Sequence, residues 1–474
     1  MAMKVDTVIA GGRVVTGNGV IEGSVGIRDG RIACLAEGAH PGDLTAPEVI
    51  DARGRWVLPG LIEPHCHFWD PGPTHREDWS TGTAAAAAGG ITTVIEMPLS
   101  DPPTVDAAAF TLKLNRAAAQ ARVDWALWGG IVPESAGDLE RRLDDMDALG
   151  AVAYKAFMCW SAREFPPVDD GVLATALSKL GQRQGLLAVH AENDAIIRFA
   201  EARLRESGRR DPAAYLASRP PQAELEAIER AMMLARVAGA PLYIVHMTLA
   251  EGARRIRAAR EGGQVVFVET APQYLALDEE AVLRQGPYAK CAPPLRSRAN
   301  VEALWTAVLD GTVDTIGSDH APFTREEKDA GAADIWEAPN GLSGIQTMLP
   351  VLLTEGVHRR AMSMERLCEL TSTHAARIFG LYPRKGVIWP GSDADLVVVD
   401  LDRTWQVSGD LLFTKQAFSP YDGMVMHGGV ERTILRGRTV ARGGTVLAEP
   451  GSGRQVRPLR PRGGPVRRPA FAPS

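Results

Sequence analysis

Two histidines, His65 and His67, stand one residue apart in the stretch PHCHFWDPG, directly after the apolar run WVLPGLI. Residues i and i+2 of a strand share a face, so both imidazoles can offer nitrogens to one metal ion. A lone histidine at the end of a strand is more often a hydrogen-bonded core or rim residue. Further ligands near the pair are therefore needed before a metal site can be inferred.

Four more apolar runs carry a titratable residue near their C-terminal ends: Lys155 in AVAYKAFM, His190 in LLAVHAEN, His246 in LYIVHMT and Asp319 in DTIGSDHAP. Imidazoles and carboxylates are common ligands of divalent metals. A carboxylate such as Asp319 can also take a proton from a metal-activated water, as a general base. The neighbouring His320 should point to the opposite face, outside the ligand set.

Lys155 lies among apolar neighbours, where an ammonium group bears a heavy desolvation cost. It must therefore be deprotonated, paired or modified. A neutral lysine in a metal site can react with carbon dioxide to give a carbamate, whose two oxygens can bridge two divalent cations. The alternative is an ion pair with a carboxylate such as Glu96 or Glu269.

The segments that would position these residues alternate between strand-like and helical patterns from residue 58 to residue 380. Strand and helix in alternation are typical of βα units around a parallel sheet. Eight strand candidates in this region predict an α/β fold, a (β/α)8 barrel. Active sites lie at the C-terminal face of such barrels, so all six candidate ligands would converge on one mouth.

The two ends of the chain differ from this central region. Residues 1–57 and 381–446 are rich in short strands and glycine turns, which predicts one small β-sandwich domain built from both segments. Residues 447–474 are rich in Pro, Gly and Arg, and we interpret them as a disordered basic tail. No aromatic interleaving accompanies the arginines, which argues against a nucleic-acid role.

Composition favours small-molecule chemistry. The 474 residues are 45% hydrophobic and carry a net charge of −6, so neither a nucleic-acid nor a membrane partner is indicated. The N-terminal text lacks the order of a signal peptide, and we expect a cytoplasmic protein. Five cysteines without CxxC spacing disfavour a disulfide framework and a cysteine zinc site.

The motifs LPGLIEPHCHFWDPG, YKAFM, VHAEN, IVHMT and GSDHAPF resemble the cyclic-amidohydrolase branch of the amidohydrolase superfamily, which contains allantoinases, hydantoinases (dihydropyrimidinases) and dihydroorotases. The resemblance implies two divalent metal ions, usually Zn²⁺ with Mn²⁺ or Fe²⁺ as alternatives, and a homo-oligomer, either a dimer or a tetramer. It implies that a hydroxide bridging the metals attacks a ring amide while Asp319 moves the proton to the leaving nitrogen. It places the ligands as follows: His65, His67 and Asp319 on one ion, His190 and His246 on the other, and carboxylated Lys155 between them.

Within this branch the sequence is most similar to allantoinases, through stretches such as THREDWSTGTAAAAAGGITTVIEMPLSDPPTVD and KCAPPLR. The implied substrate is a cyclic ureide such as allantoin or a hydantoin. Gln273 stands where allantoinases commonly carry histidine. Trp160 occupies the place of a substrate-binding tyrosine of hydantoinases, and Asn340 matches a hydantoinase residue that contacts the ring. These departures make a D-hydantoinase or dihydropyrimidinase the alternative, and we add Cys291 to the candidate substrate contacts.

Three other functions are disfavoured. Trp69 stands where dihydroorotases carry an arginine that binds the substrate carboxylate, and tryptophan cannot form that charged fork. We expect Trp69 to form an apolar wall of the substrate site, with packing on a neighbouring loop as the alternative. A non-catalytic scaffold would have lost ligands, yet every ligand position is filled. A phosphotriesterase-like or deaminase function is disfavoured by DPGPTHRED and KCAPPLR, which belong to the ring-amide branch.

Overall fold

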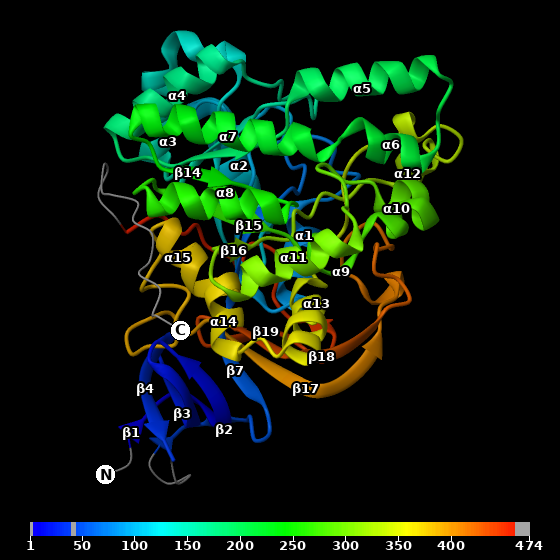
Figure 1. The fold of residues 1–474 in the computed structure, drawn as a ribbon. Coiled ribbons are helices and arrows are strands. Elements are labelled where there is room, and N and C mark those ends of the chain that lie inside the picture. The colour runs from blue at the N-terminus through cyan, green and yellow to red at the C-terminus, as the bar shows by residue number, and fades with distance from the viewer. Residues whose placement is uncertain (1–2, 39–43, 460–474) are drawn as a thin grey trace.

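The computed structural model describes residues 3–38 and 44–459. A large barrel with helices around it lies above a small β-sheet that contains the N-terminal strands (Figure 1). Within the described part of the chain, no helix is both long and apolar enough to cross a membrane.

The barrel is built from short parallel strands whose residues are almost all buried, as expected for strands covered on both faces. The first and last strands are joined, since His67 N donates to His320 O at 2.8 Å. The predicted (β/α)8 barrel is confirmed. The strands are β8 (Leu61–Cys66), β9 (Ile91–Glu96), β10 (Asp124–Leu127) continued by β11 (Gly129–Gly130), β12 (Tyr154–Phe157), β13 (Leu187–His190), β14 (Leu242–Ile244), β15 (Val266–Thr270) and β16 (Thr315–Ile316).

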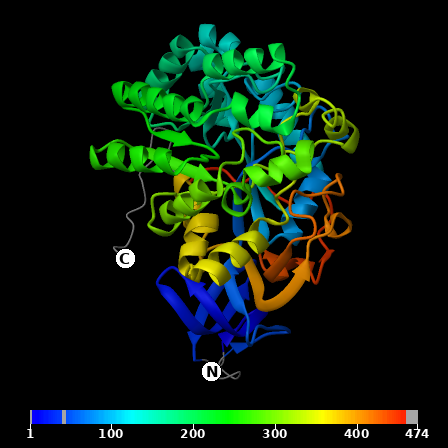
Figure 2. The same cartoon turned by 45° about the vertical axis from the view of Figure 1, so that its right-hand side comes forward.

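Helices cover the outside of the barrel, as Figure 2 shows. Several begin at an Asp, Asn or Ser whose side chain accepts a main-chain N–H of the first turn, including Asp78, Asn193 and Ser297. The longer helices are α1 (Trp79–Ala88), α2 (Ala107–Gln120), α3 (Leu139–Leu149), α4 (Asp170–Gln182), α5 (Asp194–Glu206), α7 (Pro221–Ala238), α8 (Ala250–Glu261) and α11 (Arg298–Leu309). The short ones are α6 (Pro212–Ser218), α9 (Pro272–Ala276), α10 (Glu279–Gln285), α12 (Arg325–Asp329), α13 (Met348–Leu352), α14 (Met364–Cys368) and α15 (His374–Ile378).

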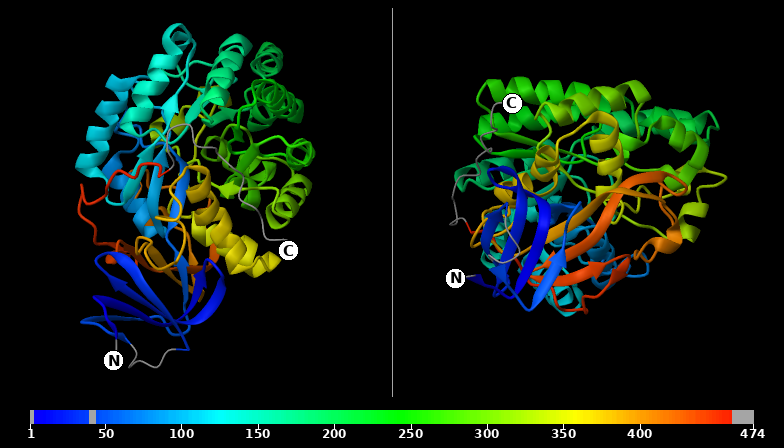
Figure 3. Two further views of the ribbon diagram at one scale, coloured as in Figure 1. Left: turned by 90° about the vertical axis from the view of Figure 1, so that its left-hand side faces the viewer. Right: turned by 90° about the horizontal axis from the view of Figure 1, so that it is seen from below.

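Strands from both ends of the chain form one sheet, in the order β20-β19-β18-β17-β7-β2-β3-β4, with β6 beside β2. The two ends meet where β17 pairs antiparallel with β7, with Leu396 opposite Pro59 and Val399 opposite Trp56 (Figure 3). The prediction that both termini build the small domain is confirmed. The strands are β2 (Thr7–Thr16), β3 (Gly19–Arg28), β4 (Arg31–Glu37), β6 (Glu48–Asp51), β7 (Trp56–Pro59), β17 (Leu396–Gln406), β18 (Val425–Leu435), β19 (Arg438–Arg442) and β20 (Thr445–Val446), with β1 (Met3–Lys4) and β5 (Leu44–Thr45) paired separately.

A buried lysine fastens this sheet to the barrel. Lys385 Nζ lies 2.6 Å from Asp124 Oδ2, at the start of β10, and 2.5 Å from Asp395 Oδ2, just before β17. Asp393 Oδ2 completes the cage at 3.0 Å. These three carboxylates have the spacing of a metal site, but the cation at their centre is the ammonium group of Lys385.

The interpretation of residues 447–474 as a disordered tail is wrong for residues 447–459. These residues run along the barrel, where Trp125 N donates to Arg454 O at 2.9 Å and Val456 N donates to Trp125 O at 2.7 Å. Val456 is buried in the apolar cluster that fills the barrel interior. A Cβ at Gly453 would lie 1.9 Å from Val123 O, so the close approach requires glycine. Residues 460–474 lie outside the described residues.

Candidate metal centre and substrate cavity

The predicted ligands gather at the C-terminal ends of the barrel strands. Five of them line one cavity of about 1180 Å³: His65, His67, His190, His246 and Asp319. The sixth, Lys155, is on β12 and is buried directly beside this group. The side chains converge because several apolar strands each end in a polar residue at the same mouth of the barrel.

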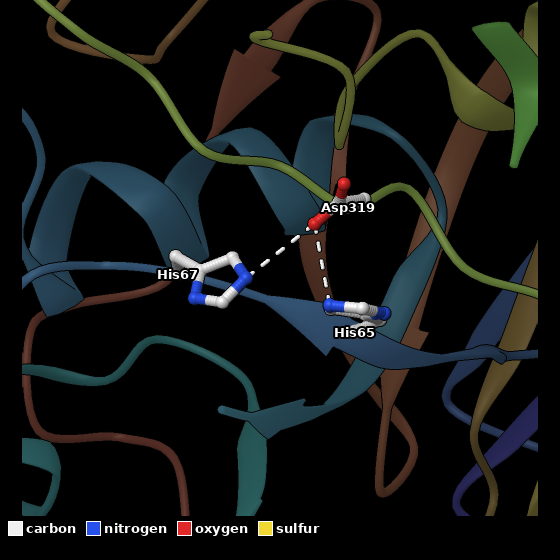
Figure 4. A group of neighbouring side chains, drawn as sticks. All are labelled: His65, His67 and Asp319. Carbon is white, nitrogen blue, oxygen red and sulfur yellow. Dashed lines mark ion pairs between the residues drawn. The ribbon is translucent and has the colours of Figure 1, made fainter. Parts of the chain in front are cut away.

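His65 and His67 point toward Asp319, which comes from the loop after β16 (Figure 4). His65 Nε2 lies 3.2 Å and His67 Nε2 lies 3.4 Å from Asp319 Oδ1. One ligand atom of each residue lies within 4.8 Å of the others. The arrangement fits three ligands of a single divalent ion.

His190 and His246 form a second group beside the first. Their ring centroids are 4.6 Å apart, and the His246 ring is 5.2 Å from that of His65. The Nδ1 atoms of His67 and His246 are buried and have no hydrogen-bond partner among the described residues. Buried polar atoms normally have partners, so these atoms mark a place where a ligand fits.

Lys155 Nζ is likewise buried without a hydrogen-bond partner among the described residues. The alternative of an ion pair with Glu96 or Glu269 is wrong, because Glu96 pairs with Lys113 at 2.6 Å and Glu269 bonds to His65 Nδ1 at 2.7 Å. Burial lowers the pKa of Lys155 to about 7, so a neutral amine is accessible near neutral pH.

The electrostatics favour metal ligation. Burial lowers the pKa of His67 to about 4, lowers the pKa of His190 and lowers that of His246 well below its ordinary value. Neutral imidazoles keep a lone pair for a metal. Burial would raise the pKa of Asp319, but the nearby His65 and the hydrogen bond from His67 outweigh it and hold that pKa below its usual value.

Three residues of the site have a left-handed backbone: Trp69 with φ of 57°, His246 with φ of 36° and Asp319 with φ of 48°. This conformation is uncommon for residues other than glycine and concentrates at functional sites. Each occurs where a strand gives way to its loop. The backbone turn redirects these side chains into the cavity.

Trp69 lies in the wall of the cavity and also packs on the loop that contains Pro322. Its ring stacks on His67 with centroids 5.7 Å apart, and its Nε1 donates to Pro322 O at 3.0 Å. The Arg76 guanidinium lies 5.2 Å from the Trp69 ring and 4.5 Å from the Phe323 ring. The wall is therefore largely aromatic, and Arg76 lines the cavity beside the two rings.

The other candidate substrate contacts also line the cavity, at different depths. Trp160 is 54% exposed at the rim, whereas Cys291 is buried and its Sγ donates to Pro293 O at 3.5 Å. Asn340 Oδ1 is buried without a partner among the described residues. Gln273, which replaces a histidine of allantoinases, is buried on α9 and does not line the cavity.

His320 is turned away from the ligand group, as expected. Its Nε2 lies 3.2 Å from Glu77 Oε2, and its Nδ1 accepts Gly344 N–H at 3.2 Å. Sequence reasoning missed the buried glutamates around the ligands, above all Glu192 and Glu269. The sequence did contain a signal for them, because each is a charged residue within or directly after an apolar strand segment, Glu192 in VHAEN and Glu269 in VFVET.

Comparison with known proteins places the chain in a family. The model of the amidohydrolase family matches residues 56–454. The chain belongs to the amidohydrolase family. An allantoinase from Rubrobacter xylanophilus is 45% identical over 97% of this chain and 99% of its own. An L-hydantoinase from Paenarthrobacter aurescens is 38% identical over 95% of this chain and 98% of its own.

Solved amidohydrolase structures agree with this assignment. The L-hydantoinase (dihydropyrimidinase) from Arthrobacter aurescens superposes with a TM-score of 0.92 at 38% identity, over 96% of this chain and all of that one. The dihydropyrimidinase from Brevibacillus agri gives a TM-score of 0.89 at 33% identity. The predicted family, fold and enzyme class, a hydrolase of cyclic amides, are confirmed.

Proposed function

We propose that this amidohydrolase opens the ring of allantoin by hydrolysis of a ring C–N bond, at a centre of two divalent ions. The observation that carries the proposal is the convergence of Asp319 with four histidines around the buried, unpartnered Lys155. The R. xylanophilus allantoinase, at 45% identity over nearly the whole chain, supports the choice of ring.

The chain offers ligands for both ions. We propose that His65, His67 and Asp319 hold one ion, that His190 and His246 hold the other, and that Lys155 joins them as a carbamate. Zn²⁺ suits this set of imidazole and carboxylate ligands. When bound, the two ions supply Lewis acidity, which polarises the ring carbonyl and makes water a stronger acid.

Asp319 moves the proton in this proposal. Its pKa is held low, so it is ionised and able to accept the proton of the attacking water. The same carboxyl group then donates that proton to the ring nitrogen as the C–N bond breaks. The aromatic wall that includes Trp69 excludes bulk water from one side of the ring.

A hydantoin or dihydropyrimidine ring is the second candidate, as in a D-hydantoinase or dihydropyrimidinase. Asn340, with its unpartnered buried Oδ1, supports it, as does the TM-score of 0.92 with the A. aurescens enzyme. That relative is named an L-hydantoinase, so its name does not favour the D stereochemistry. The hydantoin alternative is not better supported than allantoin.

Dihydroorotate hydrolysis remains disfavoured, because Trp69 in the cavity wall cannot bind a carboxylate through a charged fork. A non-catalytic scaffold is disfavoured by the complete set of ligand side chains. The resemblance also supports a homo-oligomer, which light scattering on the purified protein will test.

The deciding experiment measures hydrolysis of allantoin, hydantoin, 5-substituted hydantoins, dihydrouracil and dihydroorotate by protein loaded with Zn²⁺ or Mn²⁺ and supplied with bicarbonate. We expect turnover of allantoin and its loss in Lys155→Ala, with partial recovery when acetate supplies the missing carboxylate oxygens. A preference for hydantoins would establish the second candidate. A folded protein that binds no metal would refute the proposal.

A further inference from the structure

Each of the two histidine groups has its own buried glutamate. Glu269 Oε1 lies 2.7 Å from His65 Nδ1, and Glu192 Oε2 lies 2.7 Å from His190 Nε2. Both glutamates are fully buried. A carboxylate on one ring nitrogen fixes the tautomer and leaves the other nitrogen free for a metal.

Glu269 is itself held in place from three sides. Its Oε1 also accepts the main-chain N–H of His246 at 3.1 Å, and its Oε2 accepts Tyr243 OH at 2.9 Å. The His65 ring therefore has little rotational freedom. Its Nδ1 faces Glu269, and its Nε2 faces Asp319.

Glu192 is anchored by a separate network. The Arg219 guanidinium donates to Glu192 Oε2, and Arg219 O accepts from Arg296 at 2.7 Å. Glu192 contacts His190 through Nε2, so the free nitrogen of this ring is Nδ1. The two glutamates thus select opposite ring nitrogens in the two histidine groups.

We propose that Glu269 and Glu192 are positioning residues that each govern the affinity of one metal position, Glu269 for the ion of His65 and Glu192 for the ion of His190. The inference rests on the proposed two-metal function. The two networks share no residue, so each can be perturbed alone. Glu269 reaches the second group only through the main chain of His246.

The test measures the affinity and stoichiometry of Zn²⁺ by chelator competition and elemental analysis. Loss of a carboxylate behind a ligating histidine weakens metal binding about 10–100-fold. We expect Glu269→Gln and Glu192→Gln each to lower the affinity for one of the two ions by this factor. The affinity for the other ion should stay within about threefold of the wild-type value. Equal weakening of both ions, or two unaltered affinities, would overturn the inference.

Double variants assign each effect to its ion. In His190→Ala, which retains the first position, Glu269→Gln should weaken the remaining ion and Glu192→Gln should not. In His65→Ala, which retains the second position, the pattern should reverse. The opposite pattern, or none, would refute the pairing of each glutamate with its histidine.

Glu355→Gln is the matched control. Glu355 is also buried and pairs with Arg359 at 2.7 Å, and among the described residues none of its hydrogen bonds or ion pairs involves a histidine or a residue of either network. We expect it to lower the melting temperature while both metal affinities stay unchanged. A loss of affinity there would show that the effects come from general destabilisation.

Milder variants keep the test decisive if a glutamine variant does not fold. Tyr243→Phe removes one anchor of Glu269, and Glu192→Asp keeps the charge but withdraws the carboxylate from His190. The same selective losses are expected at smaller amplitude, and unchanged affinities would overturn the inference. If the wild-type protein binds no metal, the proposed function fails. If it binds two ions but the variants show no selectivity, this inference alone fails.

Discussion

Gly317 lies directly against the carboxylate of Glu269. A Cβ at residue 317 would be 3.0 Å from Glu269 Oε2 and 3.0 Å from His65 Cβ. The absence of a side chain at the end of β16 lets the neighbouring strands approach closely enough for the bond between His65 and Glu269 to form.

Gly317→Ala should therefore displace that pair. We expect about a 10-fold loss of affinity for one metal ion and about 1–3 kcal/mol lower stability from overpacking. Chelator competition and urea denaturation measure the two effects. Gly344→Ala is the control, because its Cβ would make an ordinary contact, 3.4 Å from Ser318 O. Unchanged metal affinity in Gly317→Ala would show that metal binding does not depend on the close approach of residue 317 to Glu269 and His65.

The sequence predicted the barrel, and it predicted which titratable residues gather at its mouth, because both have local signals. Each strand is an apolar run with a titratable residue at its end, as in AVAYKAFM for Lys155. The position of that residue relative to the run places it at the barrel mouth without any knowledge of packing. The same reasoning placed His65 and His67 on one face.

Features that depend on distant partners could not be predicted in this way. The ion pair of Lys385 with Asp124 joins residues 261 positions apart, and nothing near Lys385 in sequence indicates its partner. Val456 packs into a buried apolar cluster of the barrel, although it comes from a segment whose composition is typical of disorder. The left-handed backbone of Trp69 is set by its tertiary contacts rather than by its residue type.

Trp69→Leu should weaken substrate binding more than chemistry. The indole stacks on His67 and lines the cavity, so its loss removes apolar contact from the ring pocket. We expect KM for allantoin to rise about 10-fold, equivalent to about 1.4 kcal/mol, with kcat changed less. Steady-state kinetics measure both. Trp389→Leu, a tryptophan that is 44% exposed outside the cavity, should change neither. A fall in kcat at constant KM would contradict the proposal that Trp69 acts by contacting the substrate in the cavity wall.

Lys290→Met should loosen the loop that carries Asn340. Lys290 is buried and its Nζ donates to Ile335 O at 2.7 Å and to Ala338 O at 2.5 Å. Removal of the amine leaves two carbonyls unpaired, at about 1–3 kcal/mol for each group. We expect lower stability, a higher KM and faster proteolysis within residues 330–340.

The matched control for Lys290→Met is Lys179→Met. Lys179 pairs with the exposed Glu140 at 2.8 Å on the surface, where an ion pair contributes about 0–1 kcal/mol. The Lys179→Met variant should leave the stability and the KM unchanged. If Lys290→Met behaves in the same way, the loop does not depend on the buried amine.

Lys385→Met should destabilise the protein by about 3–5 kcal/mol at pH 7, because it leaves buried carboxylates without their cation. Burial would raise the pKa of Asp124, but Lys385 and Arg436 outweigh it and lower that pKa. A lowered pKa stabilises the fold above the unfolded value of about 4, and this contribution is lost as the pH falls through the folded value.

Lys385→Met lacks most of the stability that the ionised Asp124 contributes in the wild-type protein. The difference in stability between the two proteins should therefore shrink as the pH falls below about 4. Urea denaturation of both proteins between pH 7 and pH 3 measures the difference. A deficit that stays constant over this range would mean that the cage of Lys385 does not stabilise the ionised form of Asp124.

The pairing of β7 with β17 has a consequence for synthesis of the protein. Strands β2 to β7 leave the ribosome first, but their partner β17 follows only after the whole barrel has been translated. At about 5–20 residues per second, the apolar edge of the nascent sheet remains uncovered for about 20–70 s. During that interval it is exposed to aggregation and to chaperones. The sheet of the small domain can therefore be completed only after the whole barrel has been synthesised.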